Sequence, residues 1–182
     1  MAGTRYIALL RGINVGGHVV KMSRLRDLFG ELGFEQVRTY IQSGNVFFDS
    51  DERETHALRT RIQEHLGAAL GYDVATCLRT AEELESIIAR DPFNGISVTP
   101  DMRLAVTFFA EPVTNMISLP YLTPDGAYEV IGMSPTELFV VWHLKNGRPG
   151  NSYAHLERLF QTPTTTRFWH TTAHILSAAK ES

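Results

Sequence analysis

Cysteine and long apolar runs are nearly missing from this 182-residue sequence, and each absence narrows the class of protein. The single cysteine, Cys77, excludes an intrachain disulfide and fits a reducing compartment. Near the N-terminus the only apolar run is residues 6–10, which is too short for a signal peptide or a membrane span. We therefore expect a cytoplasmic protein that does not enter a membrane.

An excess of positive charge is missing too. The chain has 17 lysines and arginines against 20 aspartates and glutamates, which gives a formal net charge of −3. Proteins that bind nucleic-acid phosphates usually carry a basic excess on one face. This total therefore disfavours nucleic acid as a partner, although it is compatible with a local basic patch. A chain of this length buries roughly 70% of its unfolded surface and needs no metal or disulfide to fold.

The common catalytic and metal-binding signatures are also absent. No Gly-Lys-Ser/Thr tripeptide and no G-x-G-x-x-G fingerprint occurs, and Ser43 lacks the neighbours of a nucleophile elbow. His170 and His174 share a helical face, but no third ligand can be named, which disfavours a metal site. Cys77 has no flanking cation, so we expect it in the core rather than as a nucleophile. The sequence names no cofactor.

What the sequence does contain is a regular alternation of apolar segments and turn residues. In the first half it predicts the following elements in order: a strand at 5–11, a helix from an N-cap at Ser23 to Gly33, strands at 37–42 and 46–49, a helix at 54–70 and a strand at 73–78. Ser43-Gly44-Asn45 separates the second and third strands as a hairpin turn. This β-α-β-β-α-β order is typical of a ferredoxin-like unit.

The second half repeats the order. A connecting helix at 80–90 begins with Thr80 and Glu83 at capping-box spacing. The following elements are then expected: a strand at 104–110, a short helix at 112–119, strands at 127–133 and 137–144, a helix at 153–160, a strand at 164–167 and a closing helix at 169–179. We predict an α+β protein of two intertwined ferredoxin-like units. Residues 1–80 form the first, 81–101 the connecting helix and linker, and 102–182 the second.

Polar groups are expected to meet at one edge of the first sheet. The first and second strands of such a unit run parallel and the third returns between them, so the end of strand one lies beside the hairpin between strands two and three. A glycine-rich loop at 11–17 (RGINVGG), the turn at 42–45 (QSGN) and the turn at 71–73 share this edge. The candidate ligand-binding residues are Arg11, Asn14, Gly16, Gly17, Lys21, Gln42, Ser43 and Asn45.

The chemistry of this edge favours an anion. Glycines allow backbone N–H groups to converge on a ligand, and Arg11 can bind a phosphate or carboxylate through two hydrogen bonds. The first hypothesis is therefore a small anionic or nucleotide-like ligand. Three alternatives stay open: the glycines only satisfy a tight connection, the sheet face of Val46-Phe47-Phe48 binds RNA, or the chain is an enzyme acting on a phosphorylated or carboxylated small molecule. The segment at 145–152 is interpreted as a solvated surface loop.

Four segments in order resemble a known bacterial signature: residues 6–17 (YIALLRGINVGG), 21–22, 32–34 and 39–46 (TYIQSGNV). They are similar to domain-of-unknown-function family 1697, and a looser likeness extends to residues 165–169. The resemblance implies two interleaved ferredoxin-like halves, but it supplies no activity, cofactor or catalytic residue. The sequence departs from the family near the C-terminus, where Phe168 and His170 stand in the place of two asparagines.

Overall fold

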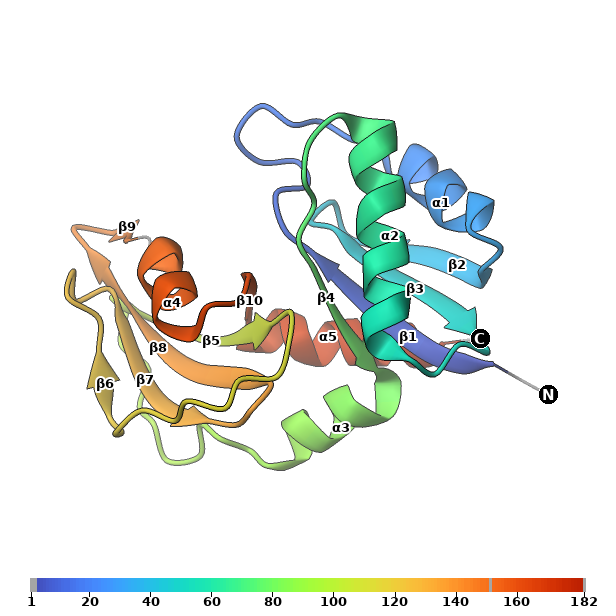
Figure 1. Cartoon of the computed structure of the whole chain (residues 1–182). Coiled ribbons are helices and arrows are strands. Elements are labelled where there is room, and N and C mark those ends of the chain that lie inside the picture. The colour runs from blue at the N-terminus through green and yellow to red at the C-terminus, as the bar shows by residue number, and fades with distance from the viewer. Residues whose placement is uncertain (1–2, 151, 182) are drawn as a thin grey trace. The chain divides into compact units, whose positions relative to one another are not determined.

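The computed structural model of the chain describes residues 3–150 and 152–181 (Figure 1). The chain forms two compact units, one made of Met1–Ser86 with Ile175–Ser182 and the other of Ile87–His174. The C-terminal segment therefore returns to the first unit. There, Arg5 and Arg38 donate hydrogen bonds to the carbonyls of Ala179 and Ala178 at 3.2 and 3.1 Å. This return makes the two units intertwined.

The first unit is a four-stranded antiparallel sheet with two helices. Its elements are β1 (Thr4–Leu10), α1 (Met22–Glu31), β2 (Glu35–Tyr40), β3 (Asn45–Ser50), α2 (Thr55–Leu70) and β4 (Thr76–Thr80). The strands lie in the order β2-β3-β1-β4, and every neighbouring pair is antiparallel. This is the order of a split βαβ fold, so the first unit is ferredoxin-like, as the sequence predicts.

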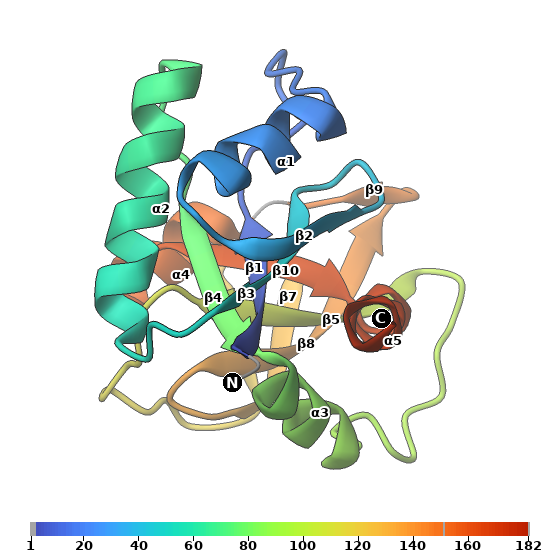
Figure 2. The ribbon, with the colours of Figure 1, turned by 90° about the vertical axis from the view of Figure 1, so that its right-hand side faces the viewer.

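The core of this unit lies between the sheet and its helices. Figures 1 and 2 show α1 and α2 on the same face of the sheet. Leu58, Ile62 and Leu66 recur every fourth residue along α2, so they line one side of the helix and are fully buried. They join a cluster with alternate residues of the strands: Tyr6, Ala8 and Leu10 of β1, and Val46 and Phe48 of β3. Burying each large side chain contributes roughly 1.5–3 kcal/mol.

The second unit has the same strand order with two additions. Its elements are β5 (Met102–Phe109), β6 (Tyr121–Leu122), β7 (Tyr128–Met133), β8 (Glu137–Lys145), β9 (Arg148–Pro149), α4 (Tyr153–Phe160) and β10 (Thr164–Phe168). The sheet runs β10-β5-β8-β7-β6, and β9 pairs with β8. Without β6 and β9 this is again the ferredoxin-like order, with α4 on the face that buries Tyr128, Val130 and Val140.

Two further helices begin in one unit and end in the other, α3 (Ala81–Ala89) and α5 (Trp169–Lys180). The capping box expected at the start of α3 is present. The Thr80 N–H donates to Glu83 Oε2 at 2.7 Å, and the Glu83 N–H donates to Thr80 Oγ1 at 3.1 Å. None of the helices in the described part of the chain combines the length and apolar character needed to cross a membrane.

Three local expectations are wrong. Residues 112–119 form no helix. Val113 N–H instead donates to the carbonyl of Pro135, in the β7–β8 turn, and the Asn115 side-chain amide donates to that of Leu159, in α4. These groups therefore bond to distant parts of the chain rather than within the segment. The N-cap of α1 is Lys21, not Ser23. The strand expected at 73–78 is β4, which begins only at Thr76.

Candidate functional site

The loop between β1 and α1 makes its turns with glycine and asparagine in the left-handed region. Backbone φ is +80° at Gly12, +56° at Asn14, +61° at Gly16 and +89° at Gly17. A Cβ atom added at Gly12, Gly16 or Gly17 would meet nothing within 4 Å, so the loop is open to solvent at these positions. Glycine is needed here for backbone conformation and not for packing.

Asn14 joins this loop to the hairpin turn. Its Nδ2 donates to the main-chain carbonyl of Gln42 at 3.1 Å, and its Oδ1 accepts from the N–H of Val20 at 2.7 Å. The Leu10 N–H donates to the carbonyl of Gly44 at 2.8 Å. The end of β1 and the β2–β3 turn therefore lie against each other, and the start of α1 is attached to both.

The hairpin turn is tightly packed beneath this link. Gly44 has φ +72°, and a Cβ there would lie 3.0 Å from Ile13 Cβ and 3.1 Å from Leu10 Cβ. Asn45 is fully buried and donates from Nδ2 to the Tyr40 carbonyl at 3.1 Å and to Ser43 Oγ at 2.9 Å. Asn45 thus stabilises the turn and is not exposed to a ligand.

The turn after α2 reaches the same edge. The Arg11 N–H donates to the carbonyl of Ala75 at 2.9 Å, just before β4. The exposed ring of His18 lies over Tyr72 with 3.9 Å between ring centroids. Burial raises the pKa of Tyr72, whose hydroxyl has no hydrogen-bond partner among the described residues. All three segments expected at this edge are thus in place.

The start of α1 has a positively charged N-cap and N–H groups that have no partner within the helix. Its N-cap, Lys21, makes no side-chain capping bond to the described residues, and the first turn holds no acidic residue. The first N–H groups of a helix have no partner within the helix and carry a partial positive charge. Arg11 and Lys21 are both exposed, one at each end of the loop. Exposed cations therefore stand at both ends of the loop, and the first N–H groups of α1 follow Lys21.

Sequence reasoning missed the apolar rim of the edge. Val15 and Val19 of the loop and Ile41 of the hairpin turn are exposed at 59%, 84% and 49%. Three branched apolar side chains on two loop tips give a ligand or partner an apolar surface beside the cationic groups. The available signal was the presence of β-branched residues inside a glycine-rich loop.

A family model described as "Protein of unknown function (DUF1697)" matches residues 3–139, which is most of the chain and includes both parts of the edge. The chain belongs to the DUF1697 family. The match ends within β8, so Phe168 and His170 lie outside it. No curated protein matches the chain.

A solved structure shares the fold of nearly the whole chain. This is the conserved bacterial protein SP0830 from Streptococcus pneumoniae, which is 24% identical to this chain with a TM-score of 0.67. The likeness covers 99% of this chain and 100% of that one. At this identity the similarity shows a common fold and transfers no function.

The aromatic residues of β3 in this DUF1697 protein do not support the RNA-binding alternative. An RNA-binding sheet needs exposed rings. Phe47 and Phe48 are only 1% and 0% exposed. Phe48 stacks on Phe34 with 4.3 Å between centroids, and the Arg38 guanidinium lies over the Phe47 ring. Phe47 and Phe48 therefore pack in the core, and β3 offers no exposed aromatic ring on which an RNA base could stack.

Lys145 and Ser152, at the two ends of the loop at 145–152, make hydrogen bonds to Asp125. The Lys145 ammonium donates to the carbonyl of Asp125, and Ser152 Oγ donates to Asp125 Oδ1 at 2.7 Å. Asn151, in the same segment, lies outside the described residues.

Cys77 is buried on β4. The His170 and His174 rings lie 6.4 Å apart, and residues 3–150 and 152–181 contain no group of three His, Cys, Asp or Glu side chains that suits a metal.

Proposed function

We propose that this DUF1697 protein binds a small anionic or nucleotide-like ligand at the edge formed by the loop at 11–17 and the turn at 42–45. The observation that carries the proposal is the double hydrogen bond of Asn14, which holds the glycine loop and the start of α1 against the hairpin. A loop held in this way presents its N–H groups in a constant arrangement, which reduces the entropy lost on binding.

Each part of the edge has a distinct role in this proposal. The N–H groups of Gly16 and Gly17, and those of the first turn of α1, donate to the anion. Arg11 binds two of its oxygens through its planar guanidinium, and Lys21 adds a point charge. The His18 and Tyr72 rings, together with Val15, offer flat and apolar surface to the uncharged part of a nucleotide.

An NMR titration of the full chain tests this proposal. Inorganic phosphate, a nucleoside monophosphate and the corresponding nucleoside are added separately, and the backbone amides are followed. We expect the amides of Gly16 and Gly17 to shift with the two phosphate-bearing probes and not with the nucleoside. A ligand at 100 times its Kd also adds about 2.7 kcal/mol to the free energy of unfolding, which a thermal melt detects.

Matched arginine variants identify the cation. Arg11→Ala is expected to lose the phosphate-dependent rise in melting temperature, whereas Arg158→Ala, at an exposed position on α4, keeps it. An equal rise in both variants would show that Arg11 plays no part in binding. Shifts confined to amides away from residues 11–21 and 42–45 would overturn the proposed position of the site.

A further inference from the structure

The sheet of the second unit has a face that is covered at one end only. Side chains alternate along β8, so Glu137, Phe139, Val141 and His143 point away from α4. At one end of this face Arg90 contacts Glu137 at 2.9 Å, and Phe93 packs on Phe139 with 6.1 Å between centroids. Val141 is also buried, at 3% exposed, and only the His143 side chain beyond it reaches 29%.

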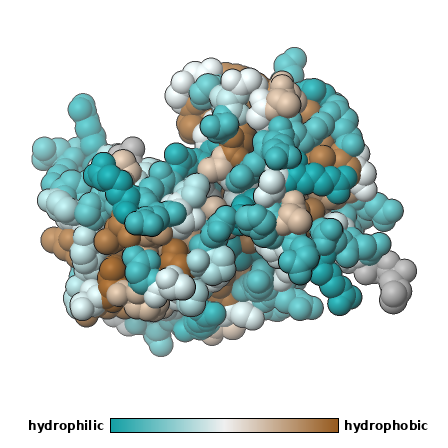
Figure 3. Space-filling model, viewed as in Figure 1, coloured by the Kyte–Doolittle hydropathy of each residue, from teal (hydrophilic) through white to brown (hydrophobic). Residues whose placement is uncertain are grey.

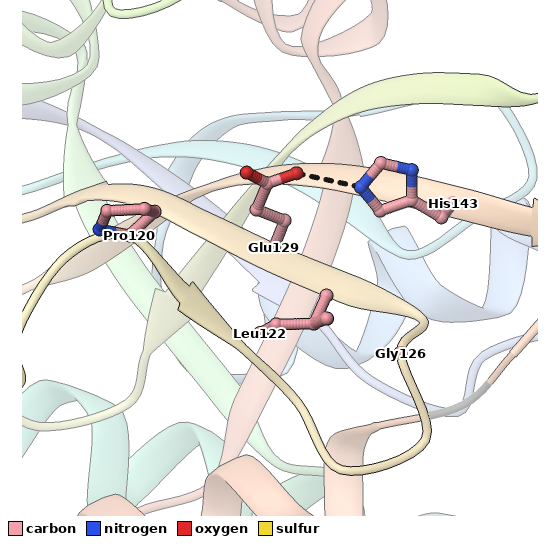
Figure 4. A pocket seen from close by; sticks show the side chains of 5 residues that line it. All are labelled: Pro120, Leu122, Gly126, Glu129 and His143. Atoms are coloured by element: carbon pink, nitrogen blue, oxygen red, sulfur yellow. Dashed lines mark hydrogen bonds and ion pairs between the residues drawn. The ribbon is translucent and has the colours of Figure 1, made fainter.

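A pocket of about 380 Å³ lies at the uncovered end. It is lined by Pro120, Leu122, Gly126, Glu129 and His143, which come from β6, β7, β8 and the turns beside them (Figure 4). Leu122 and Glu129 are directly opposite each other in the β6–β7 register, so both face the pocket. The volume is at the lower end of the range for small-molecule sites.

One wall of this pocket is apolar. Leu122 is 58% exposed although it lies in a strand, and Pro120 lines the same pocket. Figure 3 shows hydrophobic surface over the region of β6 and β7. A pocket that combines apolar side chains with a polar group is typical of a ligand site. Scattered apolar residues on a surface do not form such a pocket.

The other wall carries the Glu129 carboxylate, of which only one oxygen is paired with a described residue. His143 Nε2 lies 2.8 Å from Glu129 Oε2, and Figure 4 shows the two side chains pointing toward each other. The second oxygen, Oε1, has no hydrogen-bond partner among the described residues. A carboxylate that is only 37% exposed and half paired favours a cationic donor, because charged hydrogen bonds strengthen as water is excluded.

The position of Lys145 sets the direction of the ligand. Its ammonium lies beside Gly126 and donates to the carbonyl of Asp125, so one end of the pocket is already cationic. Pro120 lies at the opposite end, beyond the Leu122–Glu129 pair. A cationic ligand bound to Glu129 therefore extends its apolar part toward Pro120 and away from Lys145.

We propose that this pocket binds a small primary amine, whose ammonium group donates to Glu129 and whose apolar body packs on Leu122 and Pro120. The proposal is independent of the anion site, since the two sites lie in different units of the chain.

Three six-carbon probes of matched size test it: hexylamine, hexanoate and 1-hexanol. Each is titrated into the full-length protein at pH 8, and the backbone amides are followed by NMR. Hexylamine is expected to shift the amides of Leu122, Glu129 and His143, hexanol to bind at least tenfold more weakly, and hexanoate to leave these amides unchanged. Binding of hexanoate as tight as that of hexylamine would refute the charge assignment.

Variants separate the charge from the apolar wall. Glu129→Gln keeps the shape of the side chain and is expected to weaken hexylamine binding about tenfold or more, since one charged hydrogen bond is lost. Leu122→Ala weakens hexylamine and hexanol alike. The control Glu64→Gln changes an exposed glutamate of α2 and leaves both affinities unchanged. Unchanged hexylamine affinity in Glu129→Gln, or in Leu122→Ala, overturns the proposal.

Discussion

Asn14 donates its side-chain amide to the main-chain carbonyl of Gln42 at 3.1 Å, across 28 residues of sequence. The same side chain accepts the N–H of Val20 at 2.7 Å. A single residue therefore attaches a glycine loop, a hairpin turn and the start of a helix to one another. Asparagine suits this position because it tolerates the left-handed φ of +56° and carries both a donor and an acceptor.

Replacing Asn14 by alanine is expected to destabilise the protein by about 3–4 kcal/mol. Two hydrogen bonds are lost at about 1 kcal/mol each, and alanine in the left-handed region costs about 1–2 kcal/mol more. Urea denaturation measures the change. Asn14→Gly loses the hydrogen bonds without the backbone strain and should therefore be the more stable variant. Equal stabilities for the two variants would contradict the assignment of strain.

Alanine substitutions at Gly44 and Gly17 separate the cost of close packing from the cost of backbone strain. Both have positive φ, at +72° and +89°, but only a Cβ at Gly44 would approach other atoms closely. Gly17→Ala should cost about 1–2 kcal/mol from backbone strain alone. Gly44→Ala should cost about 2–5 kcal/mol, since Ile13 and Leu10 must also move. Thermal or urea unfolding of both variants tests this order, and a Gly17→Ala cost equal to that of Gly44→Ala would refute it.

Arg90 and Glu137 should be energetically coupled. The Glu137 carboxylate is fully buried and accepts from Arg90 at 2.9 Å, from Ser134 Oγ at 2.6 Å and from Thr136 Oγ1 at 2.5 Å. Arg90→Met leaves this charge in the interior with only two neutral donors, so we expect a loss of about 1–3 kcal/mol.

A second substitution at this pair should recover part of that stability. Glu137→Gln in the Arg90→Met background removes the buried charge, so the double variant should be more stable than Arg90→Met alone. Arg103→Met is the control, because Arg103 is exposed and donates to main-chain carbonyls. The measurement is a double-mutant cycle in urea, and additive effects would contradict the coupling.

Acid should weaken the second unit partly through Asp125. Burial raises the pKa of its carboxyl, but hydrogen bonds from Ser152, Thr123 and the Ala127 N–H, with Lys145 nearby, outweigh burial and hold the pKa below the ordinary 3.8. The folded state thus keeps Asp125 ionised at pH values where the unfolded chain already takes up a proton. The stabilisation is present above about pH 4 and is lost as the pH falls through the folded pKa.

Asp125→Asn is expected to flatten this part of the pH dependence. Asparagine keeps an acceptor oxygen but does not titrate, so the difference in melting temperature between the two proteins should shrink from pH 7 to pH 3. A difference that stays constant over this range would show that Asp125 does not contribute.

Much of the fold follows from local patterns. The four-residue spacing of Leu58, Ile62 and Leu66, closed by Gly71, predicts α2 to within a residue, because helix periodicity and a left-handed cap depend only on near neighbours. The hairpin turn at Gly44 follows for the same reason. The segment at 112–119 did not follow, since its hydrogen bonds go to Pro135 and Leu159, which its own sequence cannot indicate.

The candidate sites, like the fold, were predicted only in part from the sequence. Element order predicted that the loop after β1 would lie beside the β2–β3 turn. It did not predict that Asn14 would make the link, that Asn45 would be buried or that Phe47 would be covered. The pair of Glu129 and His143, separated by 14 residues, was not predicted at all, because only the strand register brings the two together.

The amino-acid sequence by itself determined the order of the elements, the family and the segments that share one edge of the first sheet. These features depend on periodicity and turn chemistry, which act over a few residues. Only the tertiary structure decided which polar side chains are buried, which apolar ones are exposed and which carboxylate faces a pocket. Burial and cross-strand pairing depend on distant parts of the chain, and no local pattern records them.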